Sequence, residues 1–133
     1  VIVDDDMTRF VEKEGEWSLS ENPEVIRHQI TFYTNTGKDP ASITYQPWLP
    51  KAGNYAVYGW WAKDPKAATN VPLTIHYKGG TKTMKMNQQQ TGDGWVPLGN
   101  YKFVEGKNGK IVITNEGADG MVEADAFKFE LLK

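Results

Sequence analysis

PKAGNYAVYGWW, residues 50–61, begins with turn-forming residues and continues as alternating aromatic and β-branched ones, which is typical of a β-strand. Successive side chains of a strand point to opposite faces. This gives one face of Tyr55, Val57 and Trp61 and a second face of Tyr58 and Trp60. A strand that packs on a core with its first face needs no large aromatics on its second, so the second face predicts a covering loop or a ligand. An aromatic face on a polar scaffold suits a sugar ring.

The rest of the chain predicts more strands and no long helix. Thirteen glycines and seven prolines divide the sequence into short segments, most of which alternate apolar and polar residues. We expect nine or ten strands, among them residues 1–3, 29–34, 42–46, 71–78, 81–87, 95–99, 101–104, 110–115 and 121–132. This pattern predicts an all-β fold, a two-sheet antiparallel β-sandwich of jelly-roll type, formed by one domain over residues 1–133.

One hairpin predicts its own register. Gly79 and Gly80 form a two-residue loop suited to positive φ angles, between segments 71–78 and 81–87. If the loop closes there, one face carries Ile75 opposite Met84 and Leu73 opposite Met86, and the other carries Thr74, His76, Thr83, Lys85 and Asn87.

Composition removes several classes of function. With 15 Lys and Arg against 17 Asp and Glu, the net charge of −2 gives no basic field for nucleic acid. The absence of cysteine excludes disulfides and thiolate chemistry. No apolar run reaches 18 residues, so we expect no membrane partner. The first residues lack the pattern of a signal peptide, and a start at Val1 suggests an excised module.

The acidic residues leave two interpretations open. Paired carboxylates, Glu123 with Asp125 or Asp4 with Asp6, are the candidates for glycosidase chemistry, but two histidines and no other polar machinery argue against catalysis. Asp125 shares the parity of the apolar residues that follow it and so points inward. It either holds backbone N–H groups or a Lys or Arg side chain near the N-terminal segment, or forms a structural calcium site with Asp4 or Asp6. The first interpretation is favoured, and we expect no cofactor.

The five tryptophans divide by their neighbours. Trp17 and Trp95 follow glycine-containing turns and are expected in the core. Trp48 lies between Pro47 and Leu49-Pro50, a rigid connection at the edge of the sandwich, and we expect it close to Trp60 across the Pro50 turn. Alternation allows only one of Trp60 and Trp61 to be buried, unless a bulge intervenes.

Motifs along nearly the whole chain resemble one family, the golvesin/xanthan-lyase carbohydrate-binding-like domain of bacterial secreted proteins. They are VIVD at 1–4, GEW at 15–17, YQP at 45–47, LPKAG at 49–53, YAVY at 55–58, ATN at 68–70, HYKGG at 76–80, NQQ at 87–89, WVPLG at 95–99 and VEADAF at 122–127. The resemblance implies a β-sandwich module appended to exported polysaccharide lyases and glycosidases, and an acidic polysaccharide such as xanthan as its partner. Trp17, Trp95, Tyr45 and Tyr55 fall on the shared motifs and are expected to be structural.

We therefore expect a secreted, non-catalytic and monomeric carbohydrate-binding module, covalently linked to a catalytic domain, with micromolar to millimolar affinity. The residues expected to contact the sugar are Trp48, Tyr58, Trp60 and Trp61 by stacking and Arg27, His76, Lys85 and Gln89 as donors. The alternative is a structural or interaction module that buries its spare aromatics against a neighbouring domain.

Overall fold

The computed structural model describes residues 2–4, 11–14, 18–20, 32–35, 41–61, 67–90, 94–120, 122–124 and 126–132, with only the backbone described for 2–4, 18–20 and 32–35. These residues contain twelve β-strands and no helix, which confirms the all-β prediction. Within this part of the chain, no helix is long and apolar enough to cross a membrane.

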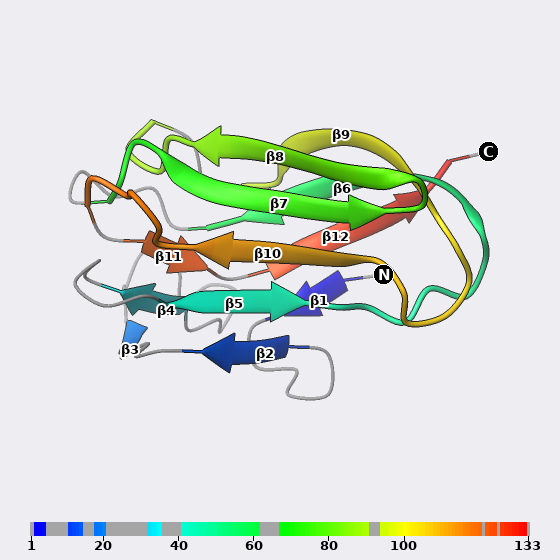
Figure 1. Cartoon of the computed structure of the whole chain (residues 1–133), viewed down its shortest axis with the longest axis horizontal. Helices are drawn as coiled ribbons and strands as arrows, with labels where there is room; N and C mark the ends of the chain where they lie inside the picture. Colours follow the sequence, from blue (N-terminus) through cyan, green and yellow to red (C-terminus); the bar gives the residue numbers. More distant parts are fainter. Residues whose placement is uncertain are drawn as a thin grey trace.

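Two antiparallel sheets form a sandwich (Figure 1). In order, the four-stranded sheet consists of β1 (Ile2–Asp4), β12 (Ala126–Leu131), β6 (Gly53–Trp60) and β9 (Val96–Phe103). The five-stranded sheet consists of β2 (Val11–Glu14), β5 (Ser42–Tyr45), β10 (Lys110–Thr114), β7 (Val71–Tyr77) and β8 (Gly80–Met86). A small third sheet consists of β11 (Val122–Ala124), β4 (Phe32–Asn35) and β3 (Ser18–Ser20). The predicted two-sheet sandwich is confirmed, and its jelly-roll connectivity stays a prediction.

Aromatic rings fill the core between the two large sheets. Tyr45 of β5 packs edge to face on Phe127 of β12, with ring centroids 4.7 Å apart. Phe103 of β9 does the same with Phe129 of β12 and Tyr55 of β6, at 5.5 and 5.9 Å. All five side chains are at most 2% exposed, so Tyr45 and Tyr55 are structural, as predicted.

Strand β6 alternates as its sequence predicts. Tyr55, Val57 and Trp61 are buried, while Tyr58 and Trp60 on the other face are half-buried. A Cβ on Gly59 would lie 2.6 Å from Cζ3 of Trp61. Glycine at this position is therefore what allows the Trp61 indole to fold back over the strand into the core.

The β7–β8 hairpin corrects the predicted register by two residues. The turn is Lys78-Gly79, Tyr77 pairs with Gly80, and Leu73 pairs with Met84 instead of Met86. Gly79 takes the positive φ, +103°. A two-residue shift keeps every side chain on its predicted face.

Two further strands differ from prediction. Residues 96–103 form one strand, β9, where two were expected, and a bulge leaves Leu98 without a partner between Gly99 and Pro97. The expected long strand 121–132 is divided into β11, which pairs with β4, and β12, which pairs with β1 and β6.

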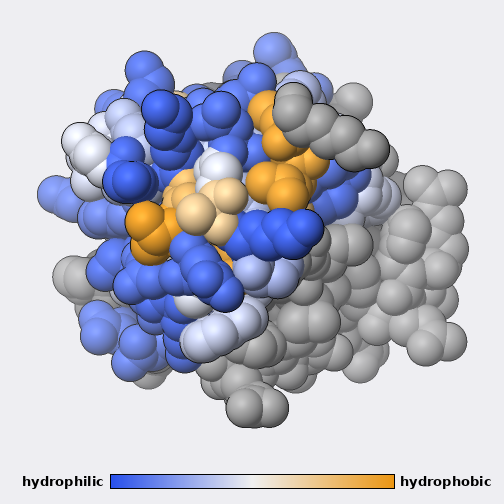
Figure 2. Space-filling model, turned by 90° about the vertical axis from the view of Figure 1, so that its right-hand side faces the viewer, coloured by the Kyte–Doolittle hydropathy of each residue, from blue (hydrophilic) through white to orange (hydrophobic). Residues whose placement is uncertain are grey.

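The registers place the connecting loops at two ends of the sandwich. Loops 46–52, 78–79 and 104–109 lie at one end, which we call the loop end, together with residue 132 after β12. Figure 2 faces this end and shows a group of hydrophobic residues surrounded by hydrophilic ones. Trp60, Trp61 and loops 67–70, 87–90 and 115–120 lie at the opposite end.

Candidate functional site

Four side chains form an aromatic surface on the outer face of the four-stranded sheet: Tyr58, Trp60, Trp95 and Lys128. The indoles of Trp60 and Trp95 pack edge to face, with ring centroids 5.3 Å apart and an interplanar angle of 79°. The Lys128 ammonium lies 4.5 Å from the ring centroid of Tyr58 and 5.0 Å from that of Trp95. All four side chains are half-buried, so the surface keeps its shape while part of it meets solvent.

Strand register builds this surface. Lys128 of β12 and Pro97 of β9 flank Tyr58 of β6, one on each side. Gly59 of β6 pairs with Val96 of β9. The next residues along these two segments, Trp60 and Trp95, therefore lie opposite each other on the outer face. The bulge at Leu98 lets that residue turn into the core while Pro97 and Trp95 stay outside.

Trp95 is the residue that sequence reasoning misplaced. It was expected as a core residue but is half-buried on the outer face, against Trp60. The alternation in WVPL at 95–98 contained the signal, because Leu98 is buried and Trp95 and Pro97 share the opposite parity. Lys128 was also missed, since its proximity to Tyr58 depends on a pairing between distant strands.

Two of the predicted stacking residues lie elsewhere. Trp61 is only 1% exposed and is a core residue, which corrects its place in the predicted sugar-binding face. Trp48 is 59% exposed but precedes β6 at the loop end, whereas Trp60 closes β6 at the other end. Eight strand residues separate these ends, about 25 Å, so the expectation that Trp48 lies close to Trp60 is wrong.

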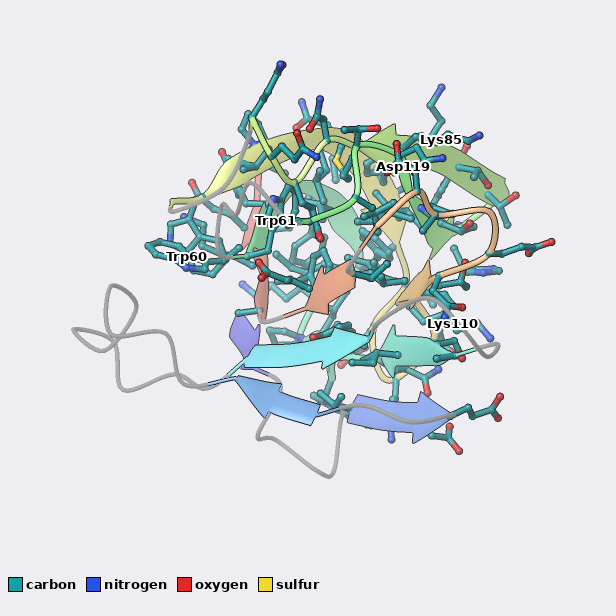
Figure 3. All side chains as sticks on the ribbon, turned by 90° about the vertical axis from the view of Figure 1, so that its left-hand side faces the viewer. Trp60, Trp61, Lys85, Lys110 and Asp119 are labelled. Carbon is teal, nitrogen blue, oxygen red and sulfur yellow. The ribbon has the colours of Figure 1, made fainter. Side chains whose placement is uncertain are left out.

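The predicted donors are dispersed. His76 and Lys85 lie on the outer face of the five-stranded sheet, and Figure 3 shows Lys85 and Trp60 on opposite sides of the sandwich. Gln89 lies in the loop after β8, where its Nε2 donates to the carbonyl of Ala67 at 2.9 Å. Arg27 lies outside the described residues. The structure therefore divides the single predicted site into separate surfaces, of which only Tyr58 and Trp60 stay together.

The acidic candidates do not form a pair that the structure describes. Glu123 is fully buried, and its backbone N–H and C=O pair with the side-chain amide of Gln88 at 2.8 and 2.7 Å. Asp6, Asp125 and the side chain of Asp4 lie outside the described residues, so the calcium interpretation stays a prediction. Among the described residues, no three His, Cys, Asp or Glu gather as metal ligands.

The opposite end of the sandwich is held by hydrogen bonds between loops. The carboxylate of Asp119 accepts from the backbone N–H of Thr69 at 2.7 Å and also from its hydroxyl. These bonds, the hydroxyl first, lower the pKa of Asp119 below its usual 3.8. Asn70 donates to the carbonyl of Gly117 at 2.9 Å. These hydrogen bonds hold the loops in position. Asp119 is the one carboxylate among them, so they do not form the pair of acids that a glycosidase needs.

Sequence and structure comparisons identify proteins that this chain resembles. The Golvesin C-terminal domain matches residues 1–131. The chain is 32% identical, over 134 aligned residues that cover 97% of it, to a xanthan lyase of Bacillus sp. (strain GL1), of which it spans 14%. The solved structure of Paenibacillus xanthan lyase matches with a TM-score of 0.92 and 38% identity, over 99% of this chain and 13% of that one.

A more distant structure shares the fold. The exo-β-1,3-galactanase of Phanerochaete chrysosporium matches 97% of this chain and 29% of its own, with a TM-score of 0.61 and 10% identity. At this identity the likeness concerns the sandwich alone. The match over residues 1–131 shows that the chain belongs to the family of Golvesin C-terminal domains.

Proposed function

We propose that this chain is a non-catalytic carbohydrate-binding module, which holds a linked polysaccharide-degrading enzyme on an acidic polysaccharide such as xanthan. The aromatic surface of Tyr58, Trp60, Trp95 and Lys128 carries this proposal. An indole or phenol face offers apolar area to the C–H face of a pyranose, and the Lys128 ammonium offers donors to hydroxyl or carboxylate oxygens.

The surface is suited to weak and reversible binding. It lies on the outer face of one sheet, and stacking on such a face corresponds to micromolar to millimolar affinity, roughly −4 to −8 kcal/mol. A covalent link to an enzyme raises the effective concentration of that enzyme on the polymer, so an individually weak contact is sufficient.

The relatives support the choice of polymer. Two xanthan lyases contain a segment similar to this chain, and in both it is a small part of a longer protein. By analogy we propose a secreted protein in which a separate domain performs catalysis and this monomeric module supplies attachment. The buried Glu123 supports a non-catalytic role, because a general acid must reach its substrate.

The test is affinity electrophoresis and calorimetry of the isolated chain on xanthan. We expect Trp60→Ala and Trp95→Ala to weaken retardation strongly, and Trp60→Phe to weaken it less. Lys128→Ala and Lys85→Ala form a matched pair, since each removes one lysine from an outer face, but only Lys128 lies over the aromatic rings. The site assignment fails if both lysine variants bind equally or if Trp60→Ala binds like the wild type.

A structural or interaction module is the second candidate. Trp48, Leu131 and Leu132 are its supporting observation, because they are exposed large hydrophobic side chains and lie at the loop end. In this case tryptophan fluorescence would not respond to acidic or neutral polysaccharides, and a neighbouring domain would protect the same three residues from solvent.

A further inference from the structure

The loop end contains a second group of potential ligand contacts, distinct from the aromatic surface. Trp48 is held rigidly there, because its neighbours Pro47 and Leu49 are buried. Leu49 also exchanges two backbone hydrogen bonds with Gly106, of 3.1 and 2.8 Å. The indole is therefore 59% exposed on a fixed backbone, which lowers the entropy lost when a ligand stacks on it.

A small cavity lies at the same end of the sandwich. It has a volume of about 120 Å³ and is lined by His76, Tyr77, Lys78, Phe103, Val104, Asn108 and Gly109. Asn108 links the cavity to Trp48, because Asn108 Nδ2 and Trp48 Cη2 lie 3.3 and 4.0 Å from the point that a Cβ on Gly106 would occupy. Gly106 has a φ of +99°. Glycine here permits both the turn and the close approach of the two side chains.

The volume of the cavity limits what can enter. It corresponds to about four water molecules, well below the roughly 300 Å³ of pockets that enclose whole small molecules. A carboxylate or a similar substituent fits, while the sugar ring that bears it stays outside. Lys78 and Asn108 in the lining supply donors for such a group.

The charge of this end favours an anion. The residues that form it, 46–55, 76–80, 101–111 and 129–132, contain five lysines and two glutamates: Lys51, Lys78, Lys102, Lys107, Lys110, Glu105 and Glu130. The chain as a whole has a net charge of −2, so positive charge is concentrated here. Burial, and then the charge of Lys110 on β10, lower the pKa of His76. The residue that pairs with His76 on β8 is Thr81, which is neutral.

We infer that the loop end is a second carbohydrate site, in which Trp48 stacks on a pyranose and the carboxylate of an acidic sugar enters the cavity beside Lys78 and Asn108. The inference rests on the proposed function and adds the acidic sugar residue as the group recognised. The two sites lie at opposite ends of β6, about 25 Å apart. A long polymer chain can occupy both, which raises avidity beyond that of either site alone.

The test uses glucuronate as the direct probe and xanthan, native or carboxyl-reduced, as the polymer. We expect glucuronate to shift the NMR signals of the Trp48 indole N–H and the Asn108 side-chain amide, with no such shifts for glucose. Lys78→Gln should weaken binding of native xanthan about 5- to 20-fold and leave binding of the carboxyl-reduced polymer unchanged. Trp48→Ala should weaken binding of both polymers, because stacking on the sugar ring does not need the carboxylate.

The outcomes separate the two proposals. If Trp60→Ala strongly weakens binding of xanthan while Lys78→Gln and Trp48→Ala bind like Lys85→Ala, the function stands and the second site is wrong. If the chain binds no polysaccharide but glucuronate still shifts Trp48 and Asn108, the site stands and the proposed function is wrong. Absence of those shifts, together with wild-type affinity of the Lys78→Gln and Trp48→Ala variants, overturns the second site.

Discussion

Trp60 and Trp61 are adjacent and chemically identical, yet they lie in different environments. Trp61 is 1% exposed in the core, and Trp60 is half-buried against Trp95. Trp61→Ala should therefore act on stability and Trp60→Ala on binding. The pair tests the alternation of β6 directly, because a strand rotated by one residue would exchange the two outcomes.

The expected magnitudes differ several-fold. Removing a buried tryptophan side chain costs about 3–5 kcal/mol. For a chain of 133 residues the unfolding entropy is roughly 280 cal/mol/K, so each kcal/mol lowers the melting temperature by about 3.6 °C. Trp61→Ala should lower it by about 11–18 °C. Trp60→Ala loses an edge-to-face pair of about 0.5–1.5 kcal/mol and some burial, together about 4–7 °C.

Binding should show the reverse order. A pyranose that covers about 80 Å² of the Trp60 face contributes roughly 2 kcal/mol, or about 30-fold in affinity. Trp61→Ala, measured well below its melting temperature, should bind xanthan like the wild type. Thermal melts by circular dichroism and calorimetric titration give both quantities. The reasoning is refuted if Trp60→Ala is the less stable variant, or if Trp61→Ala melts within about 3 °C of the wild type.

Three further outcomes are expected. Gln88→Ala should lower the melting temperature by about 7–14 °C, because the buried N–H and C=O of Glu123 lose their partner at about 1–2 kcal/mol each. Asp119→Ala should also melt lower at pH 7, but the difference should close as the pH falls below about 4, since hydrogen bonds from Thr69 lower the pKa of this carboxyl in the folded state. Affinity for glucuronate should rise as the pH falls from 7 to 5, because a bound anion raises the lowered pKa of His76, and His76→Gln should remove this dependence.

Each of these outcomes has a matched control. Gln90→Ala changes an exposed glutamine two positions after Gln88 and should leave the melting temperature unchanged. Asp119→Asn keeps an acceptor for the Thr69 N–H and should melt between the wild type and Asp119→Ala. A pH-independent stability difference for Asp119→Ala, or a pH-dependent affinity that persists in His76→Gln, would contradict the assigned causes.

Local alternation predicted the faces of the strands well. Tyr55 and Val57 are buried as expected, and Trp61 lies on the same face as both, because the period of a strand is fixed by backbone geometry. The β7–β8 hairpin kept its faces although its turn moved from Gly79-Gly80 to Lys78-Gly79. Either glycine could supply the positive φ, so the sequence alone did not decide between the two turns.

The composition of the site depended on pairing that the sequence does not reveal. Lys128 reaches Tyr58 because β12 lies beside β6, although 70 positions separate the two residues. Trp48 appeared close to Trp60 when distance was judged along the chain, but the length of β6 separates them. Alternation assigns a residue to a face, while strand order and direction decide which residues share a ligand.

The order of the four-stranded sheet also has a consequence for how the chain folds. Strand β12, the last in sequence, lies between β1 and β6, and Val3 pairs with Phe127. A ribosome therefore releases β1 long before its neighbour in this sheet exists, and one edge of β6 stays unpaired until β12 has been synthesised. Pairing over such a sequence separation is slow, and the open edge is prone to aggregation in the meantime. Loss of residues 127–133 would remove most of this interior strand, so expression of soluble protein should depend on an intact β12.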